Sequence, residues 1–405
     1  MRILIIGGSL SLVNGPSIAV KSIAEHLNNG NEVFFFPLFP VITKNRFEWD
    51  SEVKLIEKGI SIKILVLMLK NFYKSFILIK DYINPLSFSG IPYVLATSYH
   101  RSILEIIIRR TNPDVINIHG VMLDTWGLID KVIEMQMNIC VSIHAIGAGN
   151  PNIKIKYDVD KFELDAFAKL KSDNVQVTAV STSVRDSIKE ILGIEFKDLK
   201  IIPNGVDLDK FKHFLMEKNE FLQKFDIPNN KILILHVASL SKLKNQIAVL
   251  KAIKEMHSGL RDKIHYIMVG DGSERRYLEE YTIENKIQNY ITFTGILKGS
   301  DLQNMYLSSD FFILPSTSEA LPLVFLEALA SKLPIITFDS VGGVKDLYNN
   351  CCFQLIHERD TKSIIYNVEI AIERKWDTEK IREHAKKWTW QKVSEKYLKI
   401  YKSII

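Results

Sequence analysis

The chain has 405 residues, of which 47% are hydrophobic and 24% are charged, and its formal net charge is +5. This length suits two globular domains, and the composition is that of ordinary soluble proteins. Three cysteines form neither a disulfide framework nor a metal site, and their odd number favours a reducing compartment. The mild positive charge permits an anionic partner without requiring one, and we expect no nucleic-acid partner.

The first residues, MRILIIGGSL, predict a strand and a turn rather than a secretion signal. No stretch reaches the roughly 18 uninterrupted apolar residues of a membrane span, so a cytoplasmic location is expected. An amphipathic helix is predicted over 18–27, and strands and helices then alternate, which predicts parallel sheets with helices on both faces. Gly7, Gly8 and Gly15 do not form a dinucleotide-binding motif, so this first turn suits a structural role as well as ligand binding.

Residues 58–83 combine five lysines and one aspartate with many large apolar side chains. One interpretation is a set of core helices whose lysines extend to the solvent at the edges. The other is a basic and apolar surface that contacts an anionic membrane. The sequence leaves both open.

Two predicted strands end in histidine, NPDVINIHG at His119 and NICVSIHAIGAG at His144. Ligands bind at the carboxyl ends of strands in open α/β sheets, so both are candidates, although a lone histidine such as His119 more often has a structural role. His144 precedes a loop of small residues that is unsuited to burying a histidine in a core. We therefore expect His144 to contact a ligand.

A further strand and loop, KILILHVASLSKLKNQ, places Lys242 and Lys244 where the strand ends. Such lysines are often merely solvated, but two of them at a strand end favour an anion site. Another strand ends at Leu314, and Pro322 is well placed as the first residue of the next helix, whose N-terminus would also attract an anion.

Glu319 and Glu327 flank the start of that helix. Most glutamates are surface charges. Here, however, the helix is apolar nearly all round, so Glu327 should be buried and need a partner or a ligand. The arrangement suits a ligand with a phosphate and hydroxyl groups at both ends, such as a sugar nucleotide.

These residues also carry a family resemblance. The segment SEALPLVFLEALASKLPII resembles the E-x7-E segment of glycosyltransferase family 4, the retaining enzymes with the GT-B fold. The I-P-N-G-V-D segment at 202–207, the Lys244-Asn245 pair and the Gly342-Gly343 turn with Asp346 also match. The chain departs from the family where Ala238 and Ser239 replace the usual Gly-Arg and where Ala320 and Pro322 replace glycines. Ser239 can give a phosphate only a neutral hydrogen bond, whereas arginine gives a charged, bidentate one.

The resemblance implies two Rossmann-like, doubly wound parallel-sheet domains that face a cleft. Residues 1–200 would form the acceptor-side domain, with a C-terminal helix over 385–405 packing back on it. Residues 201–384 would bind the nucleotide sugar.

The implied reaction is retaining transfer of a hexose or N-acetylhexosamine from a nucleoside diphosphate sugar, UDP rather than GDP, to a saccharide or lipid-linked saccharide. The setting would be bacterial cell-surface polysaccharide or lipopolysaccharide synthesis, in the cytoplasm or on the cytoplasmic membrane face. No metal or other cofactor is expected, because the lysines and the helix dipole would neutralise the phosphates in place of a metal held by an Asp-x-Asp motif. The implied catalytic residues are His144, Glu319 and Lys244, and Gly15, Pro16 and His119 would lie on the acceptor or phosphate side. The implied donor-binding residues are Ser239, Lys242, Lys244, Gly295, Ile296, Glu319, Ala320, Leu321, Leu323, Val324 and Glu327.

Two alternatives stay open. One is a sugar-nucleotide epimerase with the same fold, which would turn over its donor without an acceptor. The other is a non-catalytic relative that binds nucleotide sugars, as the residues at 238, 239 and 320 would allow.

Overall fold

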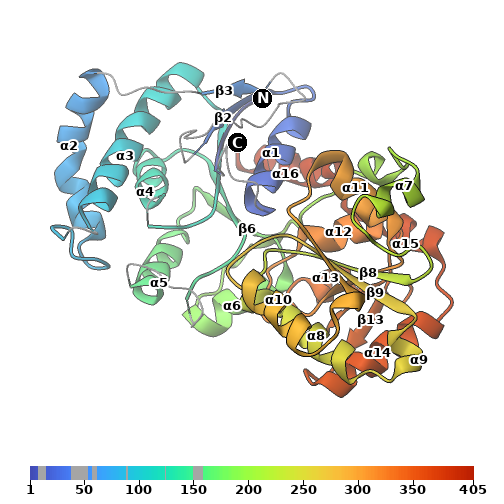
Figure 1. The fold of residues 1–405 in the computed structure, drawn as a ribbon. Coiled ribbons are helices and arrows are strands. Elements are labelled where there is room, and N and C mark those ends of the chain that lie inside the picture. Colours follow the sequence, from blue (N-terminus) through green and yellow to red (C-terminus); the bar gives the residue numbers. More distant parts are fainter. Residues whose placement is uncertain (8–14, 38–52, 57–61, 88–89, 124, 149–157) are drawn as a thin grey trace. The chain divides into compact units, whose positions relative to one another are not determined.

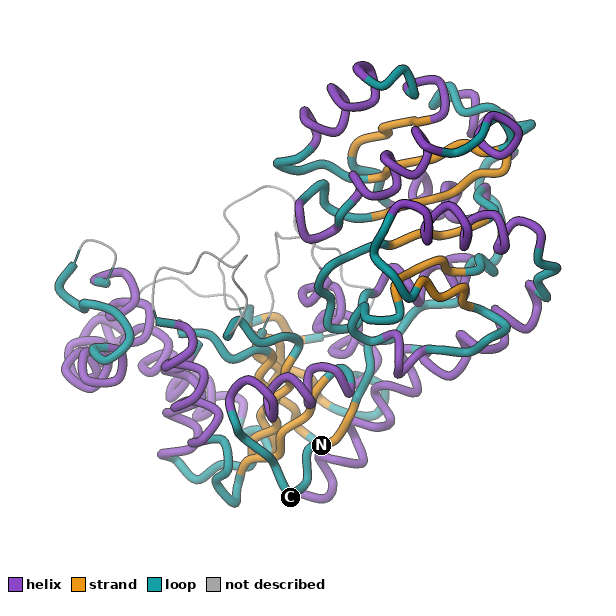
Figure 2. The backbone as a smooth tube through the Cα atoms, turned by 90° about the horizontal axis from the view of Figure 1, so that it is seen from below, coloured by secondary structure: helices purple, strands orange, loops and turns teal. Residues whose placement is uncertain are grey.

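A computed structural model describes residues 1–7, 15–37, 53–56, 62–87, 90–123, 125–148 and 158–405. The chain divides into two compact units, one formed by Met1–Asn204 with Trp390–Ile405 and the other by Gly205–Thr389. Each contains a parallel sheet flanked by helices (Figures 1 and 2), which confirms the predicted fold class. The division falls between Asn204 and Gly205, and residues 385–389 lie in the second unit.

The first unit is built on a seven-stranded sheet of order β3-β2-β1-β4-β5-β6-β7. Its central strands are almost fully buried and mostly apolar, as expected for a parallel sheet covered on both sides, although β4 and β5 also carry buried polar side chains. The strands are β1 (Arg2–Ile6), β2 (Glu32–Phe36), β3 (Lys54–Leu55), β4 (Val115–His119), β5 (Ile139–Ile143), β6 (Val175–Ala179) and β7 (Lys200–Ile201).

Helices cover this sheet in two groups. The C-terminal helix α16 packs beside α1, while α2 packs on α3 and α3 packs on α4 (Figure 1). The helices are α1 (Gly15–Leu27), α2 (Ile62–Ile79), α3 (Ile91–Thr111), α4 (Trp126–Glu134), α5 (Val159–Lys169), α6 (Thr182–Leu192) and α16 (Trp390–Ile404). In the described parts of the chain, no helix is both long and apolar enough to span a bilayer.

Buried hydroxyl and amide groups join α16 to the sheet. The amide of Asn117 donates to the Tyr401 hydroxyl at 2.5 Å, and the Tyr397 hydroxyl donates to Ser142 at 3.1 Å. Thr178 also donates to Ser142, at 3.0 Å. Because these buried polar groups satisfy one another, they fix the position of α16 against β4 and β5.

The second unit has a six-stranded sheet of order β10-β9-β8-β11-β12-β13. The strands are β8 (Ile232–Val237), β9 (Ile264–Val269), β10 (Ile291–Gly295), β11 (Phe311–Leu314), β12 (Ile335–Phe338) and β13 (Phe353–Ile356). The α-helices are α7 (Lys218–Gln223), α8 (Gln246–Glu255), α9 (Ser258–Arg261), α10 (Arg275–Glu284), α11 (Gly299–Ser308), α12 (Leu323–Ala330), α13 (Val344–Leu347), α14 (Thr361–Glu373) and α15 (Thr378–Ala385). Short 3-10 helices are η1 (Asp209–Phe211), η2 (Lys242–Lys244), η3 (Gln288–Tyr290) and η4 (Lys386–Trp388).

Candidate active site

Two of the candidate residues form an ion pair in the second unit. Lys244 follows β8 and Glu319 follows β11, and these strands are neighbours in the sheet. The Lys244 ammonium lies 2.5 Å from Oε1 of Glu319, and the Ser316 hydroxyl donates to the same oxygen at 2.7 Å. The other oxygen, Oε2, has no hydrogen-bond partner among the described residues, so it can accept from a ligand.

The two loops that carry this pair are fastened to each other. The Thr317 amide donates to the carbonyl of Leu243 at 2.8 Å, and the Asn245 side chain donates to the carbonyl of Pro315 at 3.2 Å. Asn245 has φ of 54°, the left-handed conformation that asparagine tolerates better than most residues. These contacts hold Lys244 close to Glu319 before any ligand arrives.

Lys242 lies elsewhere on the same loop. It is exposed and lines a cavity of about 590 Å³ together with Asn245, Glu274 and Tyr277. Ser239 is exposed as well, and its carbonyl accepts a hydrogen bond from Gln246 at 3.0 Å. The structure therefore brings Lys244, but not Lys242, into contact with Glu319.

Glu327 is held by a residue that the sequence did not identify. Its carboxylate accepts a hydrogen bond of 2.7 Å from the hydroxyl of Tyr306, which lies on α11. Burial raises the pKa of Glu327, and the hydrogen bond from Tyr306 opposes this rise. The ring of Tyr306 stacks on Phe312 of β11, so the donor is fixed in place.

The start of α12 depends on a close backbone approach. Gly343 has φ of 79°, and a Cβ atom there would lie 2.9 Å from Cα of Leu321 and 3.0 Å from the carbonyl oxygen of Ala320. This explains why residue 343 is a glycine. The sequence predicts Pro322 as the first residue of this helix. In the structure Pro322 is instead the N-cap of α12, and the helix begins with Leu323 and Val324, which are partly exposed.

Gly295 and Ile296 lie further along the sheet. Gly295 ends the edge strand β10 with φ of 73°, and the side chain of Ile296 is 65% exposed. Strands β9 and β8 separate β10 from β11, so these residues lie at the same carboxyl edge as Glu319 but at a distance from it.

The two histidines of the first unit contact each other. Nδ1 of His119 lies 2.9 Å from Nε2 of His144, because β4 and β5 are neighbours and His119 is paired with Ser142. Burial lowers the pKa of His119 well below its ordinary value and lowers the pKa of His144 to about 4. Both rings are therefore neutral at physiological pH. His144 is only partly buried, so it can also reach a ligand.

Glu163 is a second residue that the sequence did not identify. Its buried carboxylate accepts hydrogen bonds from the amides of Gly147, at 2.8 Å, and Ala148, at 2.9 Å. It thereby holds the loop that follows His144. The sequence signal that could have identified Glu163 is its position between Phe162 and Ala166, on the buried face of a helix.

Gly15 and Pro16 form the first turn of α1, which starts three residues before the predicted one. The loop before them, 8–14, lies outside the described residues.

Comparison with known proteins agrees with this architecture. Residues 54–210 match the family model described as Glycosyltransferase Family 4, and residues 217–388 match the one described as Glycosyl transferases group 1. The chain belongs to glycosyltransferase family 4. It is thus a transferase, and its fold is GT-B.

This family 4 protein is similar to two other glycosyltransferase sequences and to one solved structure. An uncharacterised glycosyltransferase of Methanocaldococcus jannaschii is 26% identical over 298 residues, which cover 71% of this chain and 75% of that protein. The alpha-monoglucosyldiacylglycerol synthase of Streptococcus pneumoniae is 34% identical over 140 residues, 34% of this chain and 32% of that protein. The crystal structure of HepE from Anabaena in complex with UDP has a TM-score of 0.69 at 15% identity, with all of both chains covered. This last likeness shows the fold alone.

Proposed function

We propose that this family 4 enzyme transfers a hexose or N-acetylhexosamine from a UDP-sugar to an acceptor hydroxyl with retention of configuration. The contact of Lys244 with Glu319 at the start of α12 carries this proposal, because it puts a cation for a diphosphate beside a carboxylate for sugar hydroxyls. UDP, rather than GDP, is supported by the related fold that was crystallised with UDP.

In the proposed reaction, the bond between the anomeric carbon and the diphosphate breaks while a bond to the acceptor oxygen forms on the same face. The acceptor proton passes to the departing diphosphate. Lys244 neutralises the charge that develops there, and Glu319 binds the sugar hydroxyls. Glu327 binds the ribose, and His144 contacts the sugar near the reacting carbon. Ala320, Leu321, Leu323 and Val324 place backbone groups near the diphosphate.

The reaction is proposed to need no metal ion. Lys244 and the N-terminal end of α12 supply the positive charge that a cation would otherwise give. Transfer measured in excess chelator should equal transfer without it, and a loss of activity that added magnesium restores would refute this point.

The proposed acceptor is a saccharide or a lipid-linked saccharide, used in the assembly of a bacterial surface polysaccharide or lipopolysaccharide. The name of the Streptococcus pneumoniae relative refers to a glucosylated diacylglycerol, which supports an acceptor at a lipid surface. A peripheral position on the cytoplasmic face of the membrane would suit such an acceptor.

The first test is a thermal-shift screen with UDP, GDP, ADP and their sugar conjugates, with Glu327→Ala as the control. A ligand that binds only the folded protein stabilises it by about 2.7 kcal/mol at a hundredfold excess over its Kd. A shift with UDP in wild type and not in Glu327→Ala supports the donor site. Release of UDP that depends on an added saccharide acceptor then supports transfer.

Other outcomes favour the alternatives. Isomerisation of the sugar nucleotide without an acceptor would indicate an epimerase. Nucleotide binding with no turnover for any acceptor would indicate the binding-only relative, an alternative that the serine at 239 motivates. No shift with any nucleotide would overturn the donor site itself.

A further inference from the structure

Helix α2 carries an apolar stripe that faces solvent. Soluble proteins normally bury the apolar side of a helix against a neighbour. In α2 the exposed apolar side chains recur every three or four residues and so share one face. They include Leu69, which is 77% exposed, and Tyr73, which is 73% exposed. The complete set in α2 is Leu65, Val66, Leu69, Phe72, Tyr73 and Ile77.

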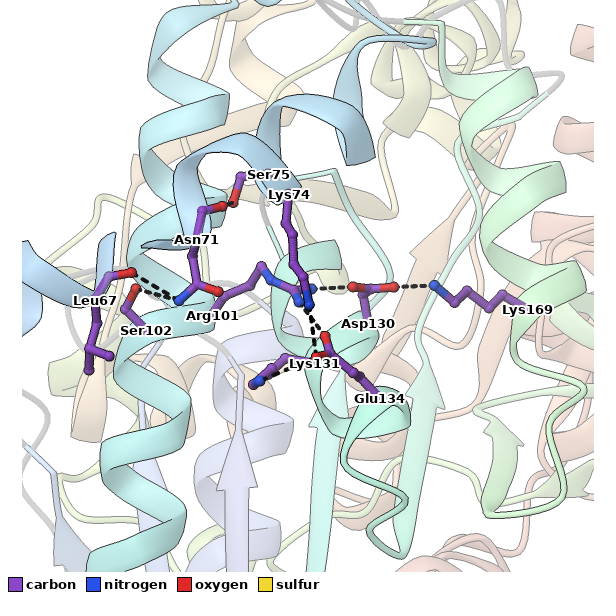
Figure 3. A network of polar contacts seen from close by, with 10 residues as sticks. All are labelled: Leu67, Asn71, Lys74, Ser75, Arg101, Ser102, Asp130, Lys131, Glu134 and Lys169. Carbon is purple, nitrogen blue, oxygen red and sulfur yellow. Dashed lines mark hydrogen bonds and ion pairs between the residues drawn. The ribbon is translucent and has the colours of Figure 1, made fainter. Parts of the chain in front are cut away.

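The opposite face of α2 is fully engaged with α3. The side chain of Asn71 donates to the hydroxyl of Ser102 at 3.0 Å, and the hydroxyl of Ser98 donates to the carbonyl of Met68 at 2.6 Å. Ser75 and Ile79 are completely buried on this side. The exposed stripe is therefore the outer side of a docked helix. Figure 3 shows the contact of Asn71 with Ser102 on the docked side.

Charged groups beneath α2 hold it further. Arg101 of α3 is 1% exposed and forms ion pairs with Asp130 and Glu134 of α4, and Lys74 of α2 pairs with Glu134 at 3.0 Å (Figure 3). Although burial raises the pKa of Glu134, hydrogen bonds from Lys74 and Arg101 lower it to about 2. The network therefore stays ionised at neutral pH and keeps the stripe on a fixed support.

Basic side chains border the stripe. Lys70 lies along one edge of α2, and Lys80 follows its last turn, whereas Asp81 is the single acidic residue between 62 and 83. Leu86, in the segment that follows α2, is also 73% exposed. A helix with a broad apolar face and lysines at its edge matches the surface of an anionic bilayer, where the apolar groups enter the headgroup boundary and the lysines meet phosphates.

A second copy of the chain fits this surface less well. Two copies related by a two-fold axis would contact each other through the same patch. Such a contact would place Lys70 and Lys80 of one copy near those of the other, and like charges repel.

We propose that the outer face of α2 docks the protein on an anionic lipid bilayer, with Leu69 and Tyr73 at the centre of the contact and Lys70 and Lys80 at its border. This docking is separate from the proposed transfer reaction, since it requires neither the donor nor the acceptor. It would bring the enzyme to the surface where a lipid-linked acceptor lies.

The test is co-sedimentation of the full chain with vesicles of phosphatidylcholine, with and without phosphatidylglycerol. We expect binding to the vesicles that contain phosphatidylglycerol, and at least about tenfold weaker binding for Leu69→Ser/Tyr73→Ser. Lys70→Gln/Lys80→Gln should reduce the preference for phosphatidylglycerol. Ile283→Ser/Tyr366→Ser, which changes side chains of similar exposure in the second unit, should bind as wild type does.

Unchanged circular dichroism and UDP binding in each variant would show that folding and the donor site are intact. The proposal is overturned if wild type ignores phosphatidylglycerol vesicles or if both apolar double variants bind equally. It is also overturned if sedimentation velocity shows a wild-type dimer that Leu69→Ser/Tyr73→Ser abolishes while vesicle binding persists, because the stripe would then serve a second copy.

Discussion

Nδ1 of His119 lies 2.9 Å from Nε2 of His144, so one ring donates a hydrogen bond to the other. His119 is almost fully buried, and its Nε2 has no partner within the described part of the chain. Among the described residues, the contact with His144 is thus the one hydrogen bond of the His119 ring. It fixes the His144 ring and leaves Nδ1 of that ring as the atom that can face a ligand.

The first prediction concerns this contact. His119→Leu removes the hydrogen bond at similar volume, and kcat/KM for transfer should fall by up to about tenfold, since one such bond contributes roughly 0.5–1.5 kcal/mol. The Kd for UDP, measured by calorimetry, should not change. His119→Asn retains a donor and should recover part of the loss. Wild-type kcat/KM in His119→Leu would show that the contact is not needed.

The second prediction concerns pH. Burial lowers the pKa of His144 from 6.5 to about 4, and the pKa of His119 is lowered as well. In the unfolded chain these rings take up protons as the pH falls below about 6.5, whereas in the folded protein they do not. The unfolded state then binds more protons, so stability falls as the pH drops from about 6.5 towards 4.

Urea unfolding at about pH 7 and about pH 5 would measure this loss. His236 and His265 of the second unit act in the same direction, because burial lowers their pKa values to about 3 and about 4. His144→Gln removes one of these sites and should show a smaller loss than wild type. Equal stability of the wild type at both pH values would contradict the assignment of rings that stay neutral in the folded protein.

Much of this architecture could be predicted from the sequence because its cause is local. Continuous apolar runs marked the buried strands, and the alternation of strands with helices predicted parallel sheets. Two strand ends with histidine could be found in the same way. Their direct contact could not, because it depends on which strands are neighbours and on their register, and neither follows from a single strand.

Hydrogen-bond partners that lie on other helices or loops also could not be predicted from the sequence. Tyr306 of α11 donates to Glu327 of α12, and nothing in the sequence of α11 distinguishes this tyrosine from others on an amphipathic helix. Glu163 stands out as a glutamate on a buried helix face, but the loop amides that it holds could not be predicted. The outer face of α2 shows a further limit. The same apolar periodicity predicts a core helix or an exposed stripe, and only the packing on α3 distinguishes the two.

The third prediction concerns Tyr306. Tyr306→Phe keeps the ring that stacks on Phe312 but removes the hydroxyl that donates to Glu327 at 2.7 Å. The carboxylate then loses its fixed orientation, and the Kd for UDP should rise about threefold to tenfold. Tyr290→Phe is a matched control, since its hydroxyl contacts Asp262 in the same unit, and its Kd should equal that of wild type. A normal Kd in Tyr306→Phe would remove Glu327 from the proposed ribose contact or show that it needs no support.

The fourth prediction separates the roles of Lys244 and Glu319. Lys244→Met should weaken UDP binding by about tenfold or more, because a hydrogen bond to a charged group contributes roughly 1.5–3 kcal/mol. Uridine, which has no phosphate, should bind as it does to wild type. Lys251→Met, which changes an exposed lysine of α8, should leave both affinities unchanged.

Glu319→Gln should behave differently, because in the free protein the Glu319 carboxylate forms an ion pair with the Lys244 ammonium at 2.5 Å. A neutral side chain competes less for the lysine, so UDP should bind as tightly as in wild type or more tightly. Transfer should nevertheless fall by at least about tenfold, since the sugar hydroxyls lose a charged acceptor. Calorimetry with UDP and initial rates of UDP release would show both effects. Equal losses of UDP affinity in Lys244→Met and Glu319→Gln would mean that the ion pair only supports the loop, and that neither residue contacts the donor.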